Sequence, residues 1–165
     1  MAGYKDAADE IVRIAIKTGK PGKLDTYVFP AIFLYRQFLE LALKDIYLSF
    51  SDDDEDEKSK MIKNSKHDLI KIWDRIKPLI SDDDPANIEG AESYLRQFAD
   101  EDKGSFAYRY PIDKKLDFVH VKKKQINLLI LAERMNEIAI YLECVSTELC
   151  ERRKMISEMR HYGMI

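Results

Sequence analysis

His67 and Asp68 form the adjacent pair with the most specific potential chemistry in this chain. Such a pair can ligate a divalent metal when further histidines complete the ligand set. Only His120 and His161 remain, and neither lies in a pattern typical of metal ligands. We therefore expect no metal and no cofactor, and interpret Ser65-Lys66-His67-Asp68 as a helix capping box. His67 is left as the candidate acid or base, because imidazole titrates near neutral pH.

Three charged side chains lie four residues apart on a strongly apolar segment: Arg36, Glu40 and Lys44. This spacing places them on one face of a helix, where they can pair in series. Charges in an apolar setting need partners. Two interpretations stay open, a polar ladder that fixes helix register and a polar patch in a binding cleft.

The segment 103–124 carries seven basic and two acidic side chains, a balance of +5, so with −3 for the whole chain the other residues carry −8. Clustered cations attract phosphates, and aromatic rings offer stacking faces for bases. The alternative is a solvated loop whose aromatic side chains pack on the body. The candidate phosphate contacts are Arg109, Lys114 and Lys115, and the candidate stacking residues are Phe106, Tyr108, Tyr110 and Phe118.

Several other features restrict the function. Dinucleotide and P-loop glycine motifs, GxSxG, HExxH and zinc-spaced Cys/His sets are absent, which excludes the familiar catalytic motifs. The acidic run 51–57 has no apolar residue, so we expect a solvated, mobile loop, with a metal or cationic-partner site as the alternative. Cys144 and Cys150 lie about 240° apart around one helix, so we expect reduced thiols.

Hydrophobic periodicity predicts about five helices, the second with two apolar stripes and the last with a coiled-coil type of seam. A helix that is apolar on two faces lies at the centre of a bundle or at a dimer seam. The last helix, about 57 Å long at 1.5 Å per residue, outruns a bundle of this size. The first expected helix covers 6–17 and is ended by residues 18–22, and the second covers 25–50. The third starts at 65–68 and is disturbed by Pro78, and the fourth starts at 84–85 and continues past Phe98. The fifth covers 122 to about 160, after an extended loop over 103–121.

Length and composition indicate one all-α domain over residues 1–165, since 45% hydrophobic content can bury a real core. No apolar run reaches about 18 residues, and the first residues have neither a basic leader nor an apolar core region. We therefore expect a cytoplasmic protein with no membrane segment.

Three blocks of sequence in this order resemble uncharacterised prokaryotic proteins related to the HEPN superfamily: residues 29–44 (FPAIFLYRQFLELALK), 66–73 (KHDLIKIW) and 105–115 (SFAYRYPIDKK). The resemblance implies an up-and-down helical bundle and frequent homodimerisation. It also implies RNA cleavage or RNA and nucleotide binding, often within toxin, antiphage or abortive-infection systems.

The ribonuclease branch of that superfamily has an arginine followed four to six residues later by a histidine on a late helix. This chain departs from the pattern. Arg134, Arg152 and Arg153 have no histidine at that spacing, and Arg160 is directly followed by His161. The departure argues against cleavage and leaves fold and binding untouched.

We therefore predict a HEPN-like, homodimeric module that binds RNA or a nucleotide without cleaving it. Alternatives are a homodimeric assembly module with a cognate protein partner, a divergent ribonuclease that uses His67, and a metal-dependent phosphohydrolase. The predicted binding residues are Arg36, Glu40, His67, Tyr108, Arg109, Lys114 and Lys115.

Overall fold

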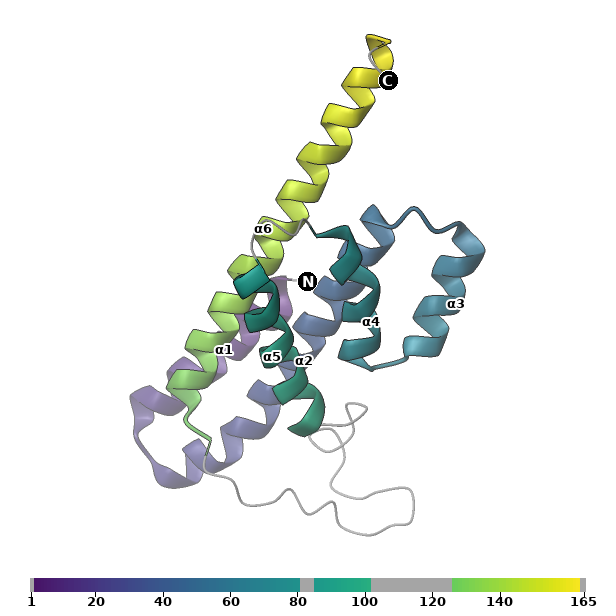
Figure 1. Cartoon of the computed structure of the whole chain (residues 1–165). Helices are drawn as coiled ribbons and strands as arrows, with labels where there is room; N and C mark the ends of the chain where they lie inside the picture. Colours follow the sequence, from purple (N-terminus) through teal and green to yellow (C-terminus); the bar gives the residue numbers. More distant parts are fainter. Residues whose placement is uncertain (1, 81–84, 102–125, 164–165) are drawn as a thin grey trace.

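The computed structural model describes residues 2–80, 85–101 and 126–163, and all the regular secondary structure in these residues is helical. The α-helices assemble into a bundle from which the end of the last helix projects (Figure 1), which confirms the predicted all-α class. The elements are α1 (Ala2–Thr18), α2 (Pro21–Phe50), α3 (Glu55–Ser65), α4 (Leu69–Ile76), the 3₁₀ turn η1 (Lys77–Leu79), α5 (Pro85–Glu101) and α6 (Leu128–His161).

The link between α1 and α2 is shorter than predicted. Gly19, with φ of +58°, ends α1, because glycine adopts the left-handed conformation without a steric penalty. Pro21 then begins α2, since a first-turn proline loses no hydrogen bond and has the φ that a helix requires. The second helix therefore starts four residues before the predicted Asp25, and the predicted five-residue stop reduces to Gly19 and Lys20.

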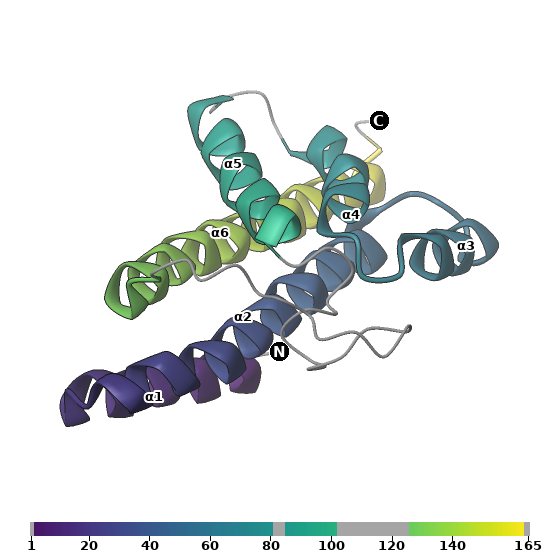
Figure 2. The same ribbon diagram turned by 90° about the horizontal axis from the view of Figure 1, so that it is seen from below.

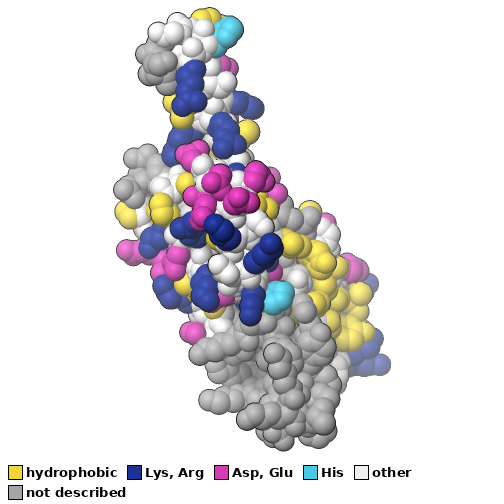
Figure 3. Space-filling model, turned by 90° about the vertical axis from the view of Figure 1, so that its right-hand side faces the viewer, with side chains coloured by type: hydrophobic (Ala, Val, Ile, Leu, Met, Phe, Trp, Pro, Cys, Tyr) yellow, Lys and Arg dark blue, Asp and Glu magenta, His cyan; other side chains and the backbone are white. Residues whose placement is uncertain are grey.

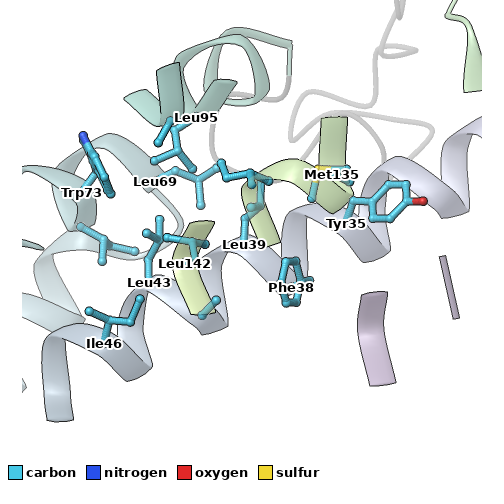
Figure 4. Close-up of a cluster of buried hydrophobic side chains, with 14 of the residues drawn as sticks. Tyr35, Phe38, Leu39, Leu43, Ile46, Leu69, Trp73, Leu95, Met135 and Leu142 are labelled. Carbon is cyan, nitrogen blue, oxygen red and sulfur yellow. The ribbon is translucent and has the colours of Figure 1, made fainter. Parts of the chain in front are cut away.

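Helix α2 is the centre of the bundle, packed against α1, α4 and α6. One predicted stripe is buried throughout: Ile32, Tyr35, Leu39, Ala42 and Ile46. The other is buried at Phe38 and half-buried at Leu34 and Leu41. Figure 4 shows side chains of α2 meeting those of α4, α5 and α6 in one core. One apolar face is thus covered by other helices of the same chain, and the second is covered in part.

Helix α3 was not predicted, and it begins inside the acidic run. Asp54 caps it, with its carboxylate accepting a hydrogen bond from the Glu57 amide at 2.8 Å. Asp53 accepts from the Tyr47 hydroxyl at 2.6 Å and from Arg75 at 3.1 Å. The predicted loop over 51–57 therefore ends at Asp54, because acidic side chains suit a helix N-terminus and the next three residues begin α3. Most of the acidic side chains are exposed, which agrees with the prediction of a solvated run.

Helix α4 begins at Leu69 with Asp68 as its cap, where the Asp68 carboxylate accepts from the amides of Ile70 and Lys71 at 3.1 and 3.2 Å. The predicted capping box, with Ser65 as the cap, was wrong because Ser65 is the last residue of α3. The predicted core face is confirmed, and Pro78 lies in η1 after the helix ends. The buried residues of that face are Leu69, Ile72, Trp73 and Ile76.

Helix α6 starts at Leu128, six residues later than predicted, because the Asn127 side chain caps the amides of Leu129 and Ile130. Its predicted seam faces the body, and all of the seam residues are buried apart from a half-buried Leu131. The buried ones are Leu128, Met135, Ile138, Leu142, Val145 and Leu149. Viewed from below, α5 lies beside α6 and α3 stands at the edge (Figure 2). Helix α6 carries Cys144 and Cys150, both free.

Candidate functional site

Glu40 is a buried carboxylate held by two side chains. Its side chain is 5% exposed, and it accepts hydrogen bonds from Lys44 Nζ at 2.6 Å and from His67 Nδ1 at 3.0 Å. Lys44 lies one helical turn along α2, whereas His67 comes from the turn between α3 and α4. The ladder prediction is confirmed for Glu40 and Lys44, which lie four residues apart.

The turn between α3 and α4 is attached to α2 by its main chain as well. Lys44 Nζ donates to the Lys66 carbonyl at 2.9 Å, and Arg36 Nη2 donates to the His67 carbonyl. Within the turn, the Asp68 amide donates to the Ser65 carbonyl at 2.8 Å. Two cations of one helix thus bind successive carbonyls and fix the position of the His67 backbone.

Lys66 adopts a conformation that favours glycine. Its φ and ψ are 49° and −108°, close to the first central residue of a type II′ turn, where L side chains are strained. Such strain is found where the surrounding structure fixes the conformation, and it clusters at binding sites. The hydrogen bonds to the Lys66 and His67 carbonyls are contacts of that kind.

His67 has one buried and one accessible side. Because a carboxylate only accepts hydrogen bonds, the Nδ1 that faces Glu40 carries the proton. The side chain is 43% exposed and lines a surface pocket, which Glu40 does not. Nδ1 is therefore occupied by the buried carboxylate, and we infer that Nε2 is the ring nitrogen available to a ligand.

The pocket beside His67 has a volume of about 560 Å³, within the range of small-molecule sites. Besides the buried Arg36, its wall includes three exposed cations, Lys66, Lys71 and Arg96, and two carboxylates, Asp68 and Asp100. Figure 3, which faces the side on which α3 lies, shows Lys and Arg side chains gathered below a group of acidic ones. Three cations and an imidazole around one hollow suit an anionic ligand.

Arg96 is positioned by a network between α4 and α5. Glu92 Oε1 accepts from Arg96 at 2.7 Å, and Glu92 Oε2 accepts from Lys77 at 2.7 Å and from Trp73 Nε1 at 3.4 Å. The hydrogen bond from Lys77, followed by that from Arg96, lowers the pKa of Glu92 to about 2. The carboxylate stays ionised in this network and holds the Arg96 guanidinium at the pocket wall.

The structure brings together three of the predicted binding residues, Arg36, Glu40 and His67. The other four, Tyr108, Arg109, Lys114 and Lys115, lie outside the described residues. The prediction omitted the pocket cations Lys66, Lys71 and Arg96. Lys66 and Lys71 flank His67 in one short block, a signal that could have been used, but Arg96 is brought there by helix packing alone.

A metal site does not emerge from the geometry. Within residues 2–80, 85–101 and 126–163, no three His, Cys, Asp or Glu side chains are grouped so that they could hold an ion. Asp68 caps α4, and His67 turns its Nδ1 to Glu40. No helix in the same residues is long and apolar enough to cross a membrane.

Comparisons with known proteins find no match to this chain among family models, curated proteins or solved structures. Its functional assignment therefore depends on the geometry above and on the resemblance of the three sequence blocks.

Proposed function

We propose that this protein is a HEPN-like module that binds RNA or a nucleotide through phosphate, without cleaving it. The observation that carries the proposal is the pocket in which His67, anchored on the buried Glu40, lies beside Lys66, Lys71 and Arg96. The sequence resemblance supports the same ligand class and suggests a role in a toxin–antitoxin or antiphage system.

Phosphate is the anion that this wall suits best. Arginine and lysine both bind phosphate, arginine by paired N–H groups and lysine as a point charge. Asp68 and Asp100 in the same wall moderate the positive charge and disfavour a tightly held anion. We therefore expect weak binding with a steep dependence on salt, because each neutralised phosphate releases counterions.

The proposal excludes cleavage because an RNase reaction at the 2′-hydroxyl needs a positioned base and a cation at the developing phosphorane. His67 can serve as the base, but its position on an interhelical turn differs from the arginine-to-histidine arrangement on a late helix, which this sequence lacks. A divergent ribonuclease that uses His67 remains the rival that the experiment must separate.

The test is retention of a labelled single-stranded RNA as a function of salt, with wild type, Lys71→Ala and Arg96→Ala. We expect both variants to weaken binding and to lower the salt slope by about 0.7 per lost contact. Lys63→Ala is the control, because Lys63 is exposed on α3 and does not line this pocket. Binding that ignores salt and both variants would remove this pocket from the proposal.

Two further variants separate the alternatives. RNA cleavage that disappears in His67→Ala would replace the non-catalytic proposal with the ribonuclease one. The pair Lys114→Ala plus Lys115→Ala tests whether the basic segment 103–124 contributes to retention, and an unchanged salt slope would confine binding to the pocket.

A second candidate function is assembly with another copy of this chain. The observation that favours it is the projecting end of α6, where Met155 and Tyr162 are 52% and 72% exposed and Ile156 is also exposed. Exposed apolar side chains grouped on one helix end mark interaction sites. In this proposal the homodimer forms without nucleic acid, so its measured mass is independent of added RNA.

A further inference from the structure

A second hollow lies next to the His67 pocket, on the other side of the end of α3. It has a volume of about 360 Å³ and lies between α3 and α4. The two hollows share Asn64, Ser65 and Lys71 in their walls. They are therefore neighbours on the surface, and Lys71 lines both.

The second hollow is also lined by cations. Lys60 from α3 and Arg75 from α4 join Lys71 in its wall, with Glu57 as the acidic side chain present. Across the two hollows, Arg96 and Lys66 line one, Lys71 lines both, and Lys60 and Arg75 line the other. The exposed cations of the two hollows outnumber their carboxylates, Asp68, Asp100 and Glu57, so positive charge is spread over both hollows and not confined to a single anion site.

The charges of the second hollow are accessible to a ligand. Lys60 pairs with Glu57 at 3.0 Å and Arg75 with Asp53 at 3.1 Å, while the side chains remain 66% and 49% exposed. Exposed ion pairs such as Lys60–Glu57 contribute little to stability, so a phosphate can replace or share the Glu57 carboxylate at little cost.

A ligand that uses both hollows must carry several negative charges at successive positions. A mononucleotide presents its phosphates at one end, whereas single-stranded RNA presents one phosphate per nucleotide along an extended backbone. Trp73 is fully buried, and among the described residues no Phe, Tyr or Trp ring lines either hollow, so apart from the His67 imidazole the contacts available there are to the RNA backbone.

We propose that the two hollows together bind the backbone of single-stranded RNA, with phosphates held successively from Arg96 and Lys66 past Lys71 to Lys60 and Arg75. The inference rests on the proposed function and narrows it from RNA or a nucleotide to an oligonucleotide. The second hollow supplies affinity only when the strand is long enough to reach it.

The experiment compares labelled oligouridylates of about 4 and about 12 nucleotides, lengths that bracket common single-strand site sizes. In wild type, the longer strand binds more tightly and with a steeper salt slope. Lys60→Ala weakens the longer strand about threefold and lowers its salt slope, with little effect on the shorter one. Lys63→Ala, which removes an exposed lysine of the same helix that lines neither hollow, leaves both strands unchanged.

Arg75→Gln tests the same end from α4, and a thermal melt reports whether loss of its contact with Asp53 disturbs the fold. The inference is overturned if Lys60→Ala binds the longer strand as tightly as Lys63→Ala does while Lys71→Ala and Arg96→Ala still weaken it. That result would leave the pocket proposal standing. Failure of Lys71→Ala and Arg96→Ala to weaken either strand would overturn the proposed function itself.

Discussion

Glu40 and His67 face each other, but their environments differ. Glu40 is buried and satisfies two donors, one of them a lysine. His67 is partly solvated and retains a free face toward the pocket. Removing the Glu40 carboxylate therefore leaves the Lys44 ammonium without its acidic partner, whereas removing the His67 imidazole mainly changes the wall of the pocket.

We expect Glu40→Gln to lower the free energy of unfolding by about 2 kcal/mol, because it leaves the largely buried Lys44 ammonium against a neutral amide. His67→Ala should cost less than about 1 kcal/mol, since Glu40 keeps Lys44. Urea unfolding at pH 7 measures both. Glu57→Gln, in an exposed pair with Lys60, serves as the control. If Glu40→Gln lowered the free energy of unfolding by no more than His67→Ala does, Glu40 would not be the anchor of this cluster.

The lowered pKa of Glu92 makes the free energy of unfolding depend on pH in the acid range. Its pKa lies at about 2 in the folded chain against an ordinary 4.5, so its ionised form favours folding above pH 4.5. That contribution declines as pH falls from 4.5 and is gone once pH passes below about 2. Glu92→Gln should therefore be less stable than wild type by about 1 to 2 kcal/mol at pH 7.

The measurement is the urea midpoint of both proteins from pH 7 down to the acid limit of folding. The difference between wild type and Glu92→Gln should shrink with falling pH. Glu89→Gln, at an exposed position of α5, should show no such convergence. A constant difference across the acid range would show that Glu92 acts through packing rather than through its charge.

At the scale of elements, the turn between α3 and α4 combines a site residue with backbone strain. Lys66 has the φ at which glycine is favoured, yet its side chain lines the pocket. Strain of this kind costs about 1 to 3 kcal/mol, and a glycine there would cost about 0.5 to 1 kcal/mol in chain entropy. Because the strain costs more than the entropy, glycine at position 66 would make the protein more stable, whereas lysine supplies a positive charge for a phosphate ligand.

Lys66→Gly should accordingly raise the free energy of unfolding by about 1 kcal/mol and weaken RNA retention. Lys66→Ala removes the same charge but keeps a β-carbon, so it should weaken retention without the gain in stability. Thermal melts and salt-dependent retention measure the two effects. A glycine variant that is no more stable than the alanine variant would show that the turn is not strained.

The sequence predicts helices well where apolar residues repeat, and it fails where capping and tertiary contacts decide. The faces of α4 and α6 follow from Leu69, Trp73 and Leu142 at helical spacing, and their burial confirms them. Helix α3 has few apolar residues, so its acidic first turn looked like a solvated loop. The Asn127 cap was likewise overlooked, so α6 was extended too far toward the N-terminus.

The candidate site was predictable only in part for a related reason. Glu40 and Arg36 were recognisable as charges on an apolar face, and His67 as a titratable group next to a helix start. Their convergence depends on how the turn before α4 docks on α2, which local patterns do not encode. Arg96 enters the pocket through the packing of α5 against α4, so its position could not be derived from spacing along the chain.

For the whole molecule, the end of α6 raises a question of assembly. Near the start of this end, Arg152 Nη1 donates to the Leu79 carbonyl at 3.0 Å and Arg153 Nη1 donates to the Ser49 carbonyl. No residue of α6 described beyond Leu149 is buried. Figure 1 shows this end extending past every other helix. The helix is therefore longer than the packing of its own chain requires.

We predict that the full chain is a homodimer and that the dimer depends on this projecting end, because burying Met155, Ile156 and Tyr162 against a second copy removes apolar surface from water. A chain ending at Arg153 keeps Arg152, Arg153 and the whole buried seam, so it should fold with an unchanged melting temperature. Light scattering at tens of micromolar should give twice 19.3 kDa for the full chain and a monomer for the shortened one.

Ile156→Lys is the matched point variant, since it places a charge at the centre of the apolar end without shortening the helix. It should also give a monomer with the stability of wild type, because Ile156 is exposed in the single chain. A full chain that is monomeric would refute the dimer. A shortened chain that remains dimeric would place the interface on the body of the bundle instead.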